Sequence, residues 1–380
     1  MDKGFYKILT YGCQMNVHES EKLAGMLQTR GLKSTEKTDD ADVIVFNTCC
    51  IRESAESRIV GHIGALKKLA RNKPNLIIAI CGCMSQQVGM AEMLYKKFPF
   101  ISIVFGTHNI DEFGNMLDEY RKELKYIERV LGSETKIKEG TPVSREASNN
   151  AWVNIMYGCN NFCTYCIVPH VRGRERSREV EDILSEVQEL AKTKQYTTIT
   201  LLGQNVNSYG HDLTNKITFA QLLSQAAAIA PKLTFNFMSS HPKDFSDELI
   251  DTIKNTPNIS RSIHLPVQSG SNKVLTAMNR KYTREHFIAL VGKVRAAIPD
   301  ADITTDIIVG FPGENDADYL DTENLVKAIK FNSAFIFMYS KRKGTVAACL
   351  EEQVPIAVKR ARIRNLQEIQ KEISRTKKRG

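Results

Sequence analysis

Three cysteines stand close together near the middle of the chain, in the segment Cys159-Asn-Asn-Phe-Cys163-Thr-Tyr-Cys166. They have C-x3-C-x2-C spacing and directly follow an apolar run. Zinc sites usually close with four Cys or His ligands, and electron-transfer clusters close with four cysteines. Three thiolates on a four-iron cluster would leave one iron open to bind a substrate or a cofactor. The spacing therefore predicts a cluster that takes part in chemistry.

A second trio of cysteines is spread over the N-terminal part of the chain. Cys13, Cys49 and Cys83 each follow an apolar segment that we expect to be a strand. Ligand sites of open parallel sheets form just beyond the carboxyl ends of the strands, so these three residues can converge despite their wide separation. Free cysteine is also a common buried residue, and plain packing is the alternative. Because the chain also contains the first trio, we favour a second metal site.

The remaining three cysteines have simpler interpretations. Cys81 lies inside an apolar run and is expected to point into packing. Cys50 is a neighbour of Cys49 and could compete with it as a ligand. Cys349 stands alone in a late segment and is expected to be structural.

The composition is that of a soluble globular protein with two or three domains. The chain has 380 residues, of which 42% are hydrophobic and 25% charged. No apolar run is long enough to span a membrane, and the N-terminus does not resemble a signal peptide. Clustered cysteines without an export signal favour metal or redox chemistry over disulfides. We therefore expect a cytoplasmic protein without membrane association, and we expect a monomer.

The positive charge is unevenly distributed. The net charge is +9, and residues 359–380 alone carry nine Lys or Arg against two Glu. A second cluster consists of Arg172, Arg174, Arg176 and Arg178. Both could meet a polyanion such as RNA. The alternative is a solvated helix face and tail.

The elements that would position the second trio alternate between strand and helix. The expected strands are Phe5–Thr10, Val43–Phe46, Leu76–Ile80 and Ile101–Phe105, and the expected helices include Val17–Arg30 and Ser54–Ala70. This alternation predicts an open parallel sheet with helices packed on it, an α/β domain over residues 1–120. Polar, aperiodic residues with several Gly and Pro predict a linker over 121–145.

A second α/β alternation follows over residues 146–376. Its expected strands are Trp152–Tyr157, Thr197–Leu202, Thr234–Met238, Ser262–Leu265, Ile303–Val309 and Ala334–Tyr339. Helices are expected between them, such as Val180–Ala191 and Asp316–Ile329. Six βα units predict a partial (βα)6 barrel, since eight would close a full one. A helix over Val358–Ser374 and a basic tail at 377–380 complete the expectation.

Several motifs resemble those of the radical S-adenosylmethionine (SAM) superfamily and, within it, the methylthiotransferases. They are Tyr11-Gly-Cys13-Gln-Met-Asn16, Asn47-Thr-Cys49, Gly82-Cys83-Met-Ser-Gln, Met156-Tyr-Gly-Cys159, Leu201-Leu-Gly-Gln-Asn205, Ser240-His-Pro242, His264-Leu-Pro-Val-Gln-Ser-Gly270 and Val309-Gly-Phe-Pro-Gly-Glu314. The Gln14-Met15-Asn16 stretch resembles the tRNA 2-methylthio-N6-dimethylallyladenosine synthases, the bacterial MiaB type. The resemblance covers Phe5 to about Ala348.

The resemblance implies methylthiolation of C2 of N6-isopentenyladenosine at position 37 of tRNA, beside the anticodon. That C–H bond is unactivated, so a cofactor must supply a radical. The resemblance implies two [4Fe-4S] clusters and two SAM molecules per turnover. Cys159, Cys163 and Cys166 would hold the SAM-cleaving cluster, and Cys13, Cys49 and Cys83 an auxiliary cluster that holds sulfur. The implied partners are tRNA carrying isopentenyladenosine, a low-potential electron donor such as flavodoxin or ferredoxin, and a sulfur donor.

Other polar residues are candidates for SAM contacts. Gln204, Asn205, Gln268, Ser269 and Asp306 end or follow expected barrel strands, where polar groups of a cofactor would lie, although such residues also form turns. Tyr165 is a candidate for the SAM adenine, with packing as the alternative. Arg172 and Arg174 could bind the SAM carboxylate or a tRNA phosphate.

Three further interpretations stay open. The same chemistry could act on threonylcarbamoyladenosine in tRNA or on a ribosomal-protein side chain. In a different class, the chain could be an iron–sulfur RNA-binding protein without turnover.

Members of the family usually continue into a small C-terminal β-barrel (TRAM) that binds RNA, and we expect this domain to be absent here.

Overall fold

A computed structural model describes residues 4–50, 53–132, 137–145 and 148–377. The chain forms two compact units. Unit 1 comprises Met1–Asn154 and Ile167–Arg176, and unit 2 comprises Ile155–Cys166 and Ser177–Gly380. Unit 1 therefore extends beyond the predicted domain over 1–120. It takes in the predicted linker and a short segment from the predicted barrel region.

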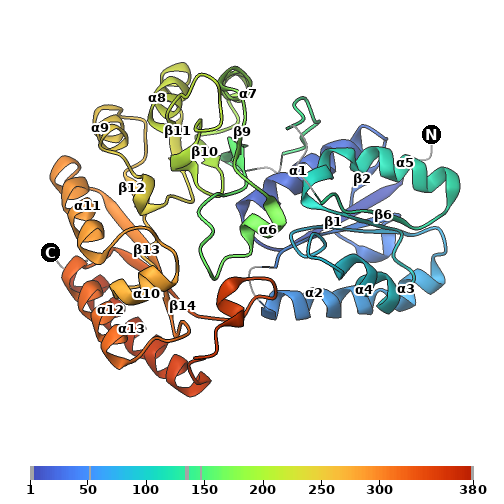
Figure 1. The fold of residues 1–380 in the computed structure, drawn as a ribbon. Helices are drawn as coiled ribbons and strands as arrows, with labels where there is room; N and C mark the ends of the chain where they lie inside the picture. The colour runs from blue at the N-terminus through green and yellow to red at the C-terminus, as the bar shows by residue number, and fades with distance from the viewer. Residues whose placement is uncertain (1–3, 51–52, 133–136, 146–147, 378–380) are drawn as a thin grey trace. The chain divides into compact units, whose positions relative to one another are not determined.

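Unit 1 contains a six-stranded parallel sheet with the order β2-β1-β3-β4-β5-β6 (Figure 1). The strands are β1 (Phe5–Thr10), β2 (Lys33–Ser34), β3 (Val43–Thr48), β4 (Ile77–Gly82), β5 (Ile103–Phe105) and β6 (Ile127–Arg129). The predicted open parallel sheet is confirmed. The linker over 121–145 was wrong in part, because β6 pairs with β5. Its three residues, Ile-Glu-Arg, are too short and too polar to give a strand pattern.

Helices cover both faces of this sheet (Figure 1). They are α1 (Gln14–Gln28), α2 (Glu53–Ala65), α3 (Lys67–Asn72), α4 (Met90–Lys97), α5 (Phe113–Glu123) and α6 (Val168–Arg172). Side chains of a strand alternate between faces, so β3 and β4 supply two separate cores. One core joins Val43 and Val45 to residues of α1 and α5, and the other joins Ile44 and Phe46 to α2 and α4.

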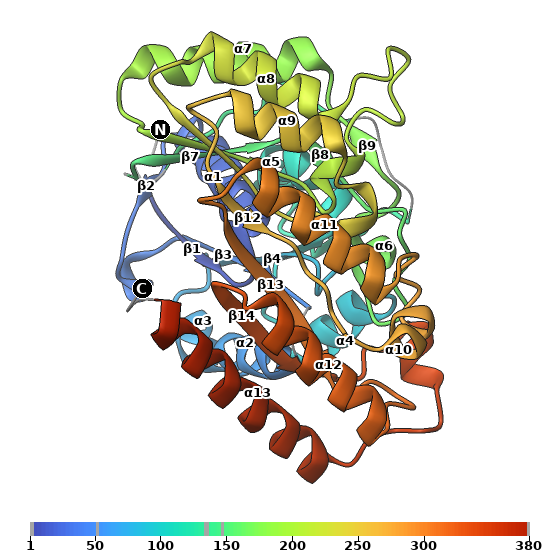
Figure 2. The same cartoon turned by 90° about the vertical axis from the view of Figure 1, so that its left-hand side faces the viewer.

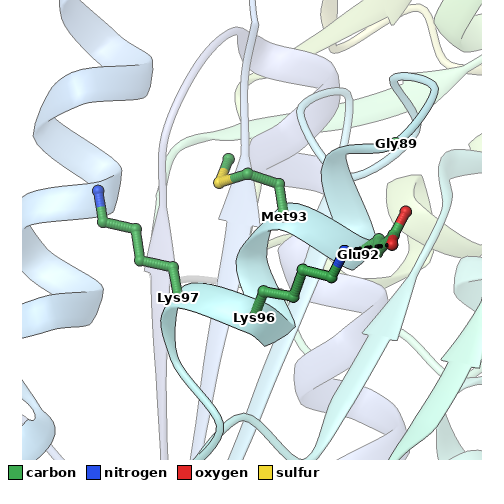
Figure 3. A pocket seen from close by; sticks show the side chains of 5 residues that line it. All are labelled: Gly89, Glu92, Met93, Lys96 and Lys97. Carbon is green, nitrogen blue, oxygen red and sulfur yellow. Dashed lines mark ion pairs between the residues drawn. The ribbon is translucent and has the colours of Figure 1, made fainter.

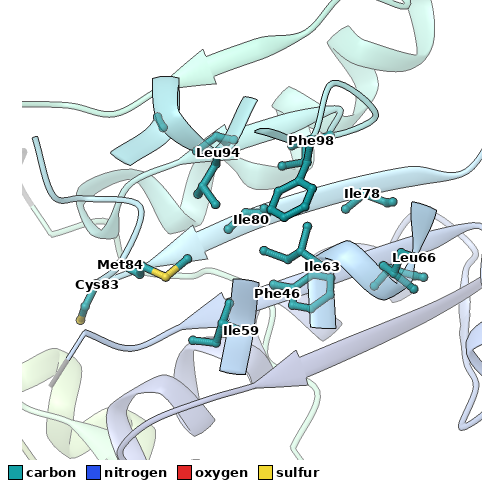
Figure 4. Packing of buried hydrophobic residues seen from close by; sticks show 14 of the residues in the cluster. Phe46, Ile59, Ile63, Leu66, Ile78, Ile80, Cys83, Met84, Leu94 and Phe98 are labelled. Atoms are coloured by element: carbon teal, nitrogen blue, oxygen red, sulfur yellow. The ribbon is translucent and has the colours of Figure 1, made fainter. Parts of the chain in front are cut away.

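The second of these cores ends at a candidate ligand. Figure 4 shows Ile59 and Ile63 of α2 and Leu94 of α4 around the buried side chains of the sheet. Cys83 lies at the margin of this cluster, next to Met84. The loop after β4 is therefore fixed by apolar packing immediately beside the residue expected to bind metal.

Unit 2 contains the predicted partial barrel. Its strands are β8 (Met156–Tyr157), β10 (Thr198–Leu202), β11 (Thr234–Phe237), β12 (Ser262–His264), β13 (Asp302–Val309) and β14 (Ser333–Met338). The backbone N of Ile155 donates to Leu202 O at 2.9 Å, β10 pairs parallel with β11, and β12, β13 and β14 form a parallel sheet. A parallel bridge from Phe235 to Ile259 connects the two groups. The predicted βα-barrel architecture is confirmed.

Helices alternate with these strands. They are α7 (Val180–Thr193), α8 (Phe219–Ile229), α9 (Asp247–Asn255), α10 (Asn272–Ala277), α11 (Arg284–Ala297), α12 (Asp316–Ile329) and α13 (Ile356–Lys377). Two short strands, β7 (Asn150–Asn154) and β9 (Arg176–Ser177), lie where the chain passes between units. None of the helices within the described residues is long and apolar enough to cross a membrane.

Helix α13 packs along β14 and beside α12 (Figure 2). Lys359 Nζ donates to Tyr339 O at 3.0 Å near its start, and Gln370 Nε2 donates to Phe331 O at 3.0 Å further along. Arg362 is buried against Glu314, with 2.6 Å between Nη1 and Oε1. Part of the basic run after residue 358 therefore stabilises the barrel and is not free for RNA. Most of the predicted tail, 378–380, lies outside the described residues.

Candidate metal centres

The register of the first sheet brings the N-terminal cysteines to one edge. Thr10 pairs with Asn47, and Asn47 pairs with Cys81. Beyond these pairs, Cys83 N donates to Thr48 O at 2.9 Å. The three strands thus end side by side, and Cys13, Cys49 and Cys83 follow at the same carboxyl edge, as predicted from the sequence.

Cys49 packs against the loop that carries Cys13. Gly12 has φ +127°, and a Cβ at this position would lie 2.7 Å from Cys49 Cβ. Cys13 is the N-cap residue of α1. Burial raises the pKa of the Cys13 thiol, the nearby Arg172 opposes this, and Cys83 adds to the increase. Cys13 Sγ lies 3.5 Å from Asn16 Oδ1, which also accepts from Arg172, and Arg172 in turn contacts Cys83 Sγ.

Cys50 and Cys81 differ in their relation to this edge. Cys81 is fully buried in the core between the sheet, α1 and α5, which confirms the prediction that it points into packing. The Cys50 thiol lies in the opposite core and donates a hydrogen bond to Cys83. That bond is the main cause that lowers the pKa of Cys83 to about 7, against the opposing effect of burial. Cys50 is therefore the one neighbour able to compete with Cys49.

A buried arginine reaches this edge from α6. Arg172 Nε lies 3.2 Å from Cys83 Sγ, and its Nη2 donates to Asn16 Oδ1 and to Glu19 Oε2, both at 3.1 Å. Nη1 also donates to Glu19 Oε1. Burial acts to lower the pKa of Arg172, but Cys83 and Glu19 raise it well above its usual range. Arg172 is a sequence-based candidate for the SAM carboxylate or a tRNA phosphate, but its side chain is only 4% exposed and contacts Glu19 within the protein.

The second cysteine trio lies in a loop after β8 that several backbone contacts fix. Gly158 N donates to the side-chain oxygen of Gln204. Asn279 Nδ2 donates to the backbone oxygen of Phe162 at 3.0 Å, and Thr164 N donates to Met278 O at 3.1 Å. Phe162 has φ +48°, a conformation that non-glycine residues adopt at a cost of order 1–3 kcal/mol. The segment after α10 therefore holds the cysteine loop in a specific conformation.

A second buried arginine contacts this trio. Arg280 Nη1 lies 3.4 Å from Cys163 Sγ, and its Nη2 donates to Pro266 O at 2.9 Å. Its Nε donates to Tyr282 at 3.1 Å. Tyr165 packs with an apolar cluster that contains Phe311, and burial raises its pKa well above the usual value. Each trio thus has one buried guanidinium next to one of its sulfurs, a feature that the sequence did not reveal.

Two of the predicted SAM residues present unsatisfied polar atoms. Asn205 is 1% exposed, and its Nδ2 donates to Asp244 at 2.8 Å, while its Oδ1 has no hydrogen-bond partner among the described residues. Gln268 has φ +70° and a buried Oε1 that finds no hydrogen-bond partner in the part of the chain that the structure describes. The buried His241 Nε2 also has no hydrogen-bond partner among the described residues. Buried polar groups are normally hydrogen-bonded, so these atoms are suited to a polar ligand.

The positions of the other predicted SAM residues give less support for a direct contact with SAM. Ser269 is fully buried, and its hydroxyl lies 3.2 Å from that of Thr322, which indicates a structural role. Asp306 Oδ2 lies 3.4 Å from His264 Nε2, and both side chains are partly exposed. Gln204 holds the start of the cysteine loop, as described above. Arg174 is exposed and belongs to unit 1.

Comparison with known proteins gives two domain matches and close relatives. Residues 153–326 match the radical SAM superfamily, and residues 6–106 match an uncharacterised protein family, UPF0004. The tRNA-2-methylthio-N6-dimethylallyladenosine synthase of Clostridium tetani (strain Massachusetts / E88) is 55% identical over 367 residues, which is 97% of this chain and 81% of that protein. That of Thermoanaerobacter pseudethanolicus (strain ATCC 33223 / 39E) is 53% identical over 370 residues, 97% of this chain and 78% of that protein.

This chain belongs to the tRNA-2-methylthio-N6-dimethylallyladenosine synthase family. Solved structures with little sequence identity share the synthase fold. The radical SAM methyltransferase TsrM from Kitasatospora setae, solved with cobalamin and a [4Fe-4S] cluster, gives a TM-score of 0.68 at 13% identity, over 92% of this chain and 77% of that one. The cobalamin-dependent SAM radical enzyme OxsB gives a TM-score of 0.60 at 14% identity, over 91% of this chain and 55% of that one.

The donor chemistry of the synthase fits the iron–sulfur clusters that its family implies. Each trio offers thiols at the carboxyl end of strands together with a guanidinium beside one sulfur. Within the described residues, no three Cys, His, Asp or Glu side chains are already grouped as in a formed metal centre.

A surface hollow elsewhere in the synthase contains none of the predicted site residues. It has a volume of about 450 Å3 and lies on α4, lined by Gly89, Glu92, Met93, Lys96 and Lys97 (Figure 3). Its polar feature is the exposed pair Glu92–Lys96, with 2.7 Å between Oε1 and Nζ. An exposed ion pair of this kind contributes little to stability, and we assign the hollow no function.

Proposed function

We propose that this chain methylthiolates C2 of N6-isopentenyladenosine at position 37 of tRNA, with two [4Fe-4S] clusters and two SAM molecules per turnover. Cys159, Cys163 and Cys166 would hold the SAM-cleaving cluster. Cys13, Cys49 and Cys83 would hold the auxiliary cluster. The main support is the identity of 55% to a synthase of this name, together with a cysteine trio at the carboxyl strand ends of each unit.

When bound, the clusters and SAM would supply the electron, the radical, the sulfur and the methyl group that no side chain can provide. The protein supplies binding and orientation. Gln204 and Asn279 fix the loop of the second trio, and Arg280 orients the Cys163 sulfur. The side-chain oxygens of Asn205 and Gln268, which accept no hydrogen bond from any described residue, suit the amino or hydroxyl donors of SAM.

Tyr165, Arg174, Gln204, Ser269 and Asp306 remain weaker SAM candidates. Tyr165 offers an aromatic ring within the cysteine motif, and Asp306 offers a partly exposed carboxylate on β13. Gln204 and Ser269 are engaged within the protein, which favours indirect roles for both.

The proposed partners follow from the reaction. They are tRNA carrying isopentenyladenosine, a low-potential donor such as flavodoxin or ferredoxin, and a sulfur donor. We place the reaction in the cytoplasm, where tRNA is modified, and we propose that the chain acts as a monomer.

Nucleoside analysis of tRNA tests this proposal. In bacteria that lack the protein, 2-methylthio-N6-isopentenyladenosine should disappear and N6-isopentenyladenosine should accumulate. Expression of the chain should restore the product, whereas C159A/C163A/C166A should not. Loss of a methylthiolated threonylcarbamoyladenosine, or of a ribosomal-protein modification, would instead identify one of the rival substrates. Unchanged nucleosides and proteins would indicate an iron–sulfur protein without this activity.

A further inference from the structure

Arg172 and Glu19 form a buried ion pair that reaches one sulfur of the N-terminal trio. Both side chains are 4% exposed. Arg172 Nη2 lies 3.1 Å from Glu19 Oε2, and Arg172 Nε lies 3.2 Å from Cys83 Sγ. Removing one partner of a buried ion pair is strongly destabilising, because it leaves the other charge buried and unpaired. The two charges are therefore held together close to Cys83.

Two buried asparagines connect this pair to the ends of the strands. Asn16 Oδ1 accepts from Arg172, and Asn16 Nδ2 donates to Asn47 Oδ1 at 3.1 Å and to Thr48 O at 3.0 Å. Asn47 Nδ2 donates back to Asn16 O at 2.8 Å and to Ser20 Oγ at 3.1 Å. Thr48 directly precedes Cys49. The guanidinium is thus fixed relative to the backbone that carries the proposed ligands.

The arginine beside the other trio has a different setting. Arg280 donates to Pro266 O and to Tyr282, which are both uncharged. Among the described residues, it forms no ion pair with a carboxylate. Glu19 therefore offsets the charge next to Cys83, whereas no acidic partner offsets the charge next to Cys163.

We propose that Arg172 is a positioning residue for the auxiliary cluster and that the Arg172–Glu19 pair sets the reduction potential of this cluster. The inference rests on the proposed function, because it requires a cluster on Cys13, Cys49 and Cys83. The potential of an iron–sulfur cluster depends on nearby charge and on hydrogen bonds to its sulfurs. Reduction adds negative charge, so Arg172 raises the potential and Glu19 lowers it.

The test uses the full chain with C159A/C163A/C166A as the parent, so that only the auxiliary cluster can bind. After anaerobic reconstitution, a redox titration is followed by electron paramagnetic resonance. In R172Q, the ratio of reduced to oxidised cluster at a fixed potential should fall about tenfold, equal to 59 mV for a one-electron couple. In E19Q the ratio should rise by a similar factor. R172K keeps the charge and should stay closer to the parent than R172Q.

R30Q is the matched control. Arg30 also pairs with a carboxylate, Asp118 at 2.7 Å, but it follows the far end of α1 and is partly exposed. The auxiliary cluster of R30Q should have the same reduction potential as that of the parent. If R172Q holds no iron, the test rests on E19Q alone, in which the reduction potential of the cluster should rise. Shifts of R172Q and E19Q in the same direction, or no shift in either, would overturn the inference. A parent that binds no iron would instead refute the proposed auxiliary site.

Discussion

Cys49 Cβ lies 2.7 Å from the point that a Cβ on Gly12 would occupy. This contact, together with the φ of +127° at Gly12, leaves no room for a side chain beside Cys13. In G12A, a strained backbone and a displaced Cys49 should separate two proposed ligands of the auxiliary cluster. We expect reconstituted iron to fall from about eight atoms per chain toward about four.

The control for this prediction is G31A. Gly31 also has a positive φ, +84°, but its added Cβ would meet no atom of the described residues within 4 Å. Iron in G31A should equal that of the wild type, although the backbone strain costs some stability. Equal iron in G12A and wild type would show that the loop around Cys13 is not part of a cluster site.

Cys49 and Cys50 can be distinguished by iron binding. Cys49 faces the loop of Cys13. Cys50 lies in the core with α2 and α4, and its thiol donates a hydrogen bond to Cys83. C49A should lose about half of the iron, about four atoms. C50A should keep all of it, with a loss of stability of about 1 kcal/mol from the missing buried hydrogen bond. The reverse pattern of iron loss would assign Cys50 as the ligand.

Arg280 should be needed for the other cluster. In R280Q, the backbone oxygen of Pro266 and the Cys163 sulfur lose their charged donor, which costs about 1–3 kcal/mol for each buried group left unsatisfied. We expect selective loss of iron from the Cys159 trio and loss of SAM cleavage. R261Q breaks an exposed ion pair with Asp300 in the same unit and should preserve both. SAM cleavage at the wild-type rate in R280Q would contradict this role.

His241 should make unit 2 less stable in mild acid. Burial, Arg280 and Lys243 lower the pKa of His241 to about 2. An unfolded histidine has a pKa of about 6.5, so the unfolded state binds more protons below that pH. The stabilising contribution is complete above pH 6.5 and decreases as the pH falls toward 2. Between pH 7.5 and 6.0 the loss should be about 1 kcal/mol.

The comparison variant is H241N, because an Asn side chain can still accept from Lys243 N, as His241 Nδ1 does at 3.2 Å. Denaturant titrations at the two pH values should show a smaller decrease in unfolding free energy for H241N than for the wild type. An identical decrease would mean that His241 titrates normally in the folded protein.

The strands could be predicted because they are buried and their side chains give a clear pattern. β1, β13 and β14 lie within one residue of the predicted positions, and α12 has the predicted bounds. β6 was missed because only Ile127 of its residues is buried. The single helix predicted over Ser54–Ala70 is interrupted at Leu66, where nothing in the sequence breaks the helical pattern.

The positions of the cysteines could be predicted from the rule that sites form at carboxyl strand ends. Their surroundings could not. Glu19 and Asn16 are polar residues on a helix whose apolar face is Leu23, Met26 and Leu27, and the sequence alone suggests that they face solvent. Both are buried and accept hydrogen bonds from Arg172, which lies more than 150 residues further along the chain. No local pattern reports such a partner.

The division of unit 1 into two chain segments has a consequence for synthesis on the ribosome. Residues up to Asn154 contain the whole six-stranded sheet, but Arg172 arrives only with the second segment, Ile167–Arg176. Until then, Glu19 and Asn16 lack the guanidinium that donates to both of them in the folded unit. The nascent domain should therefore stay incompletely folded, and a fragment cut after residue 154 would be a poor substitute for the intact protein in studies of the N-terminal site.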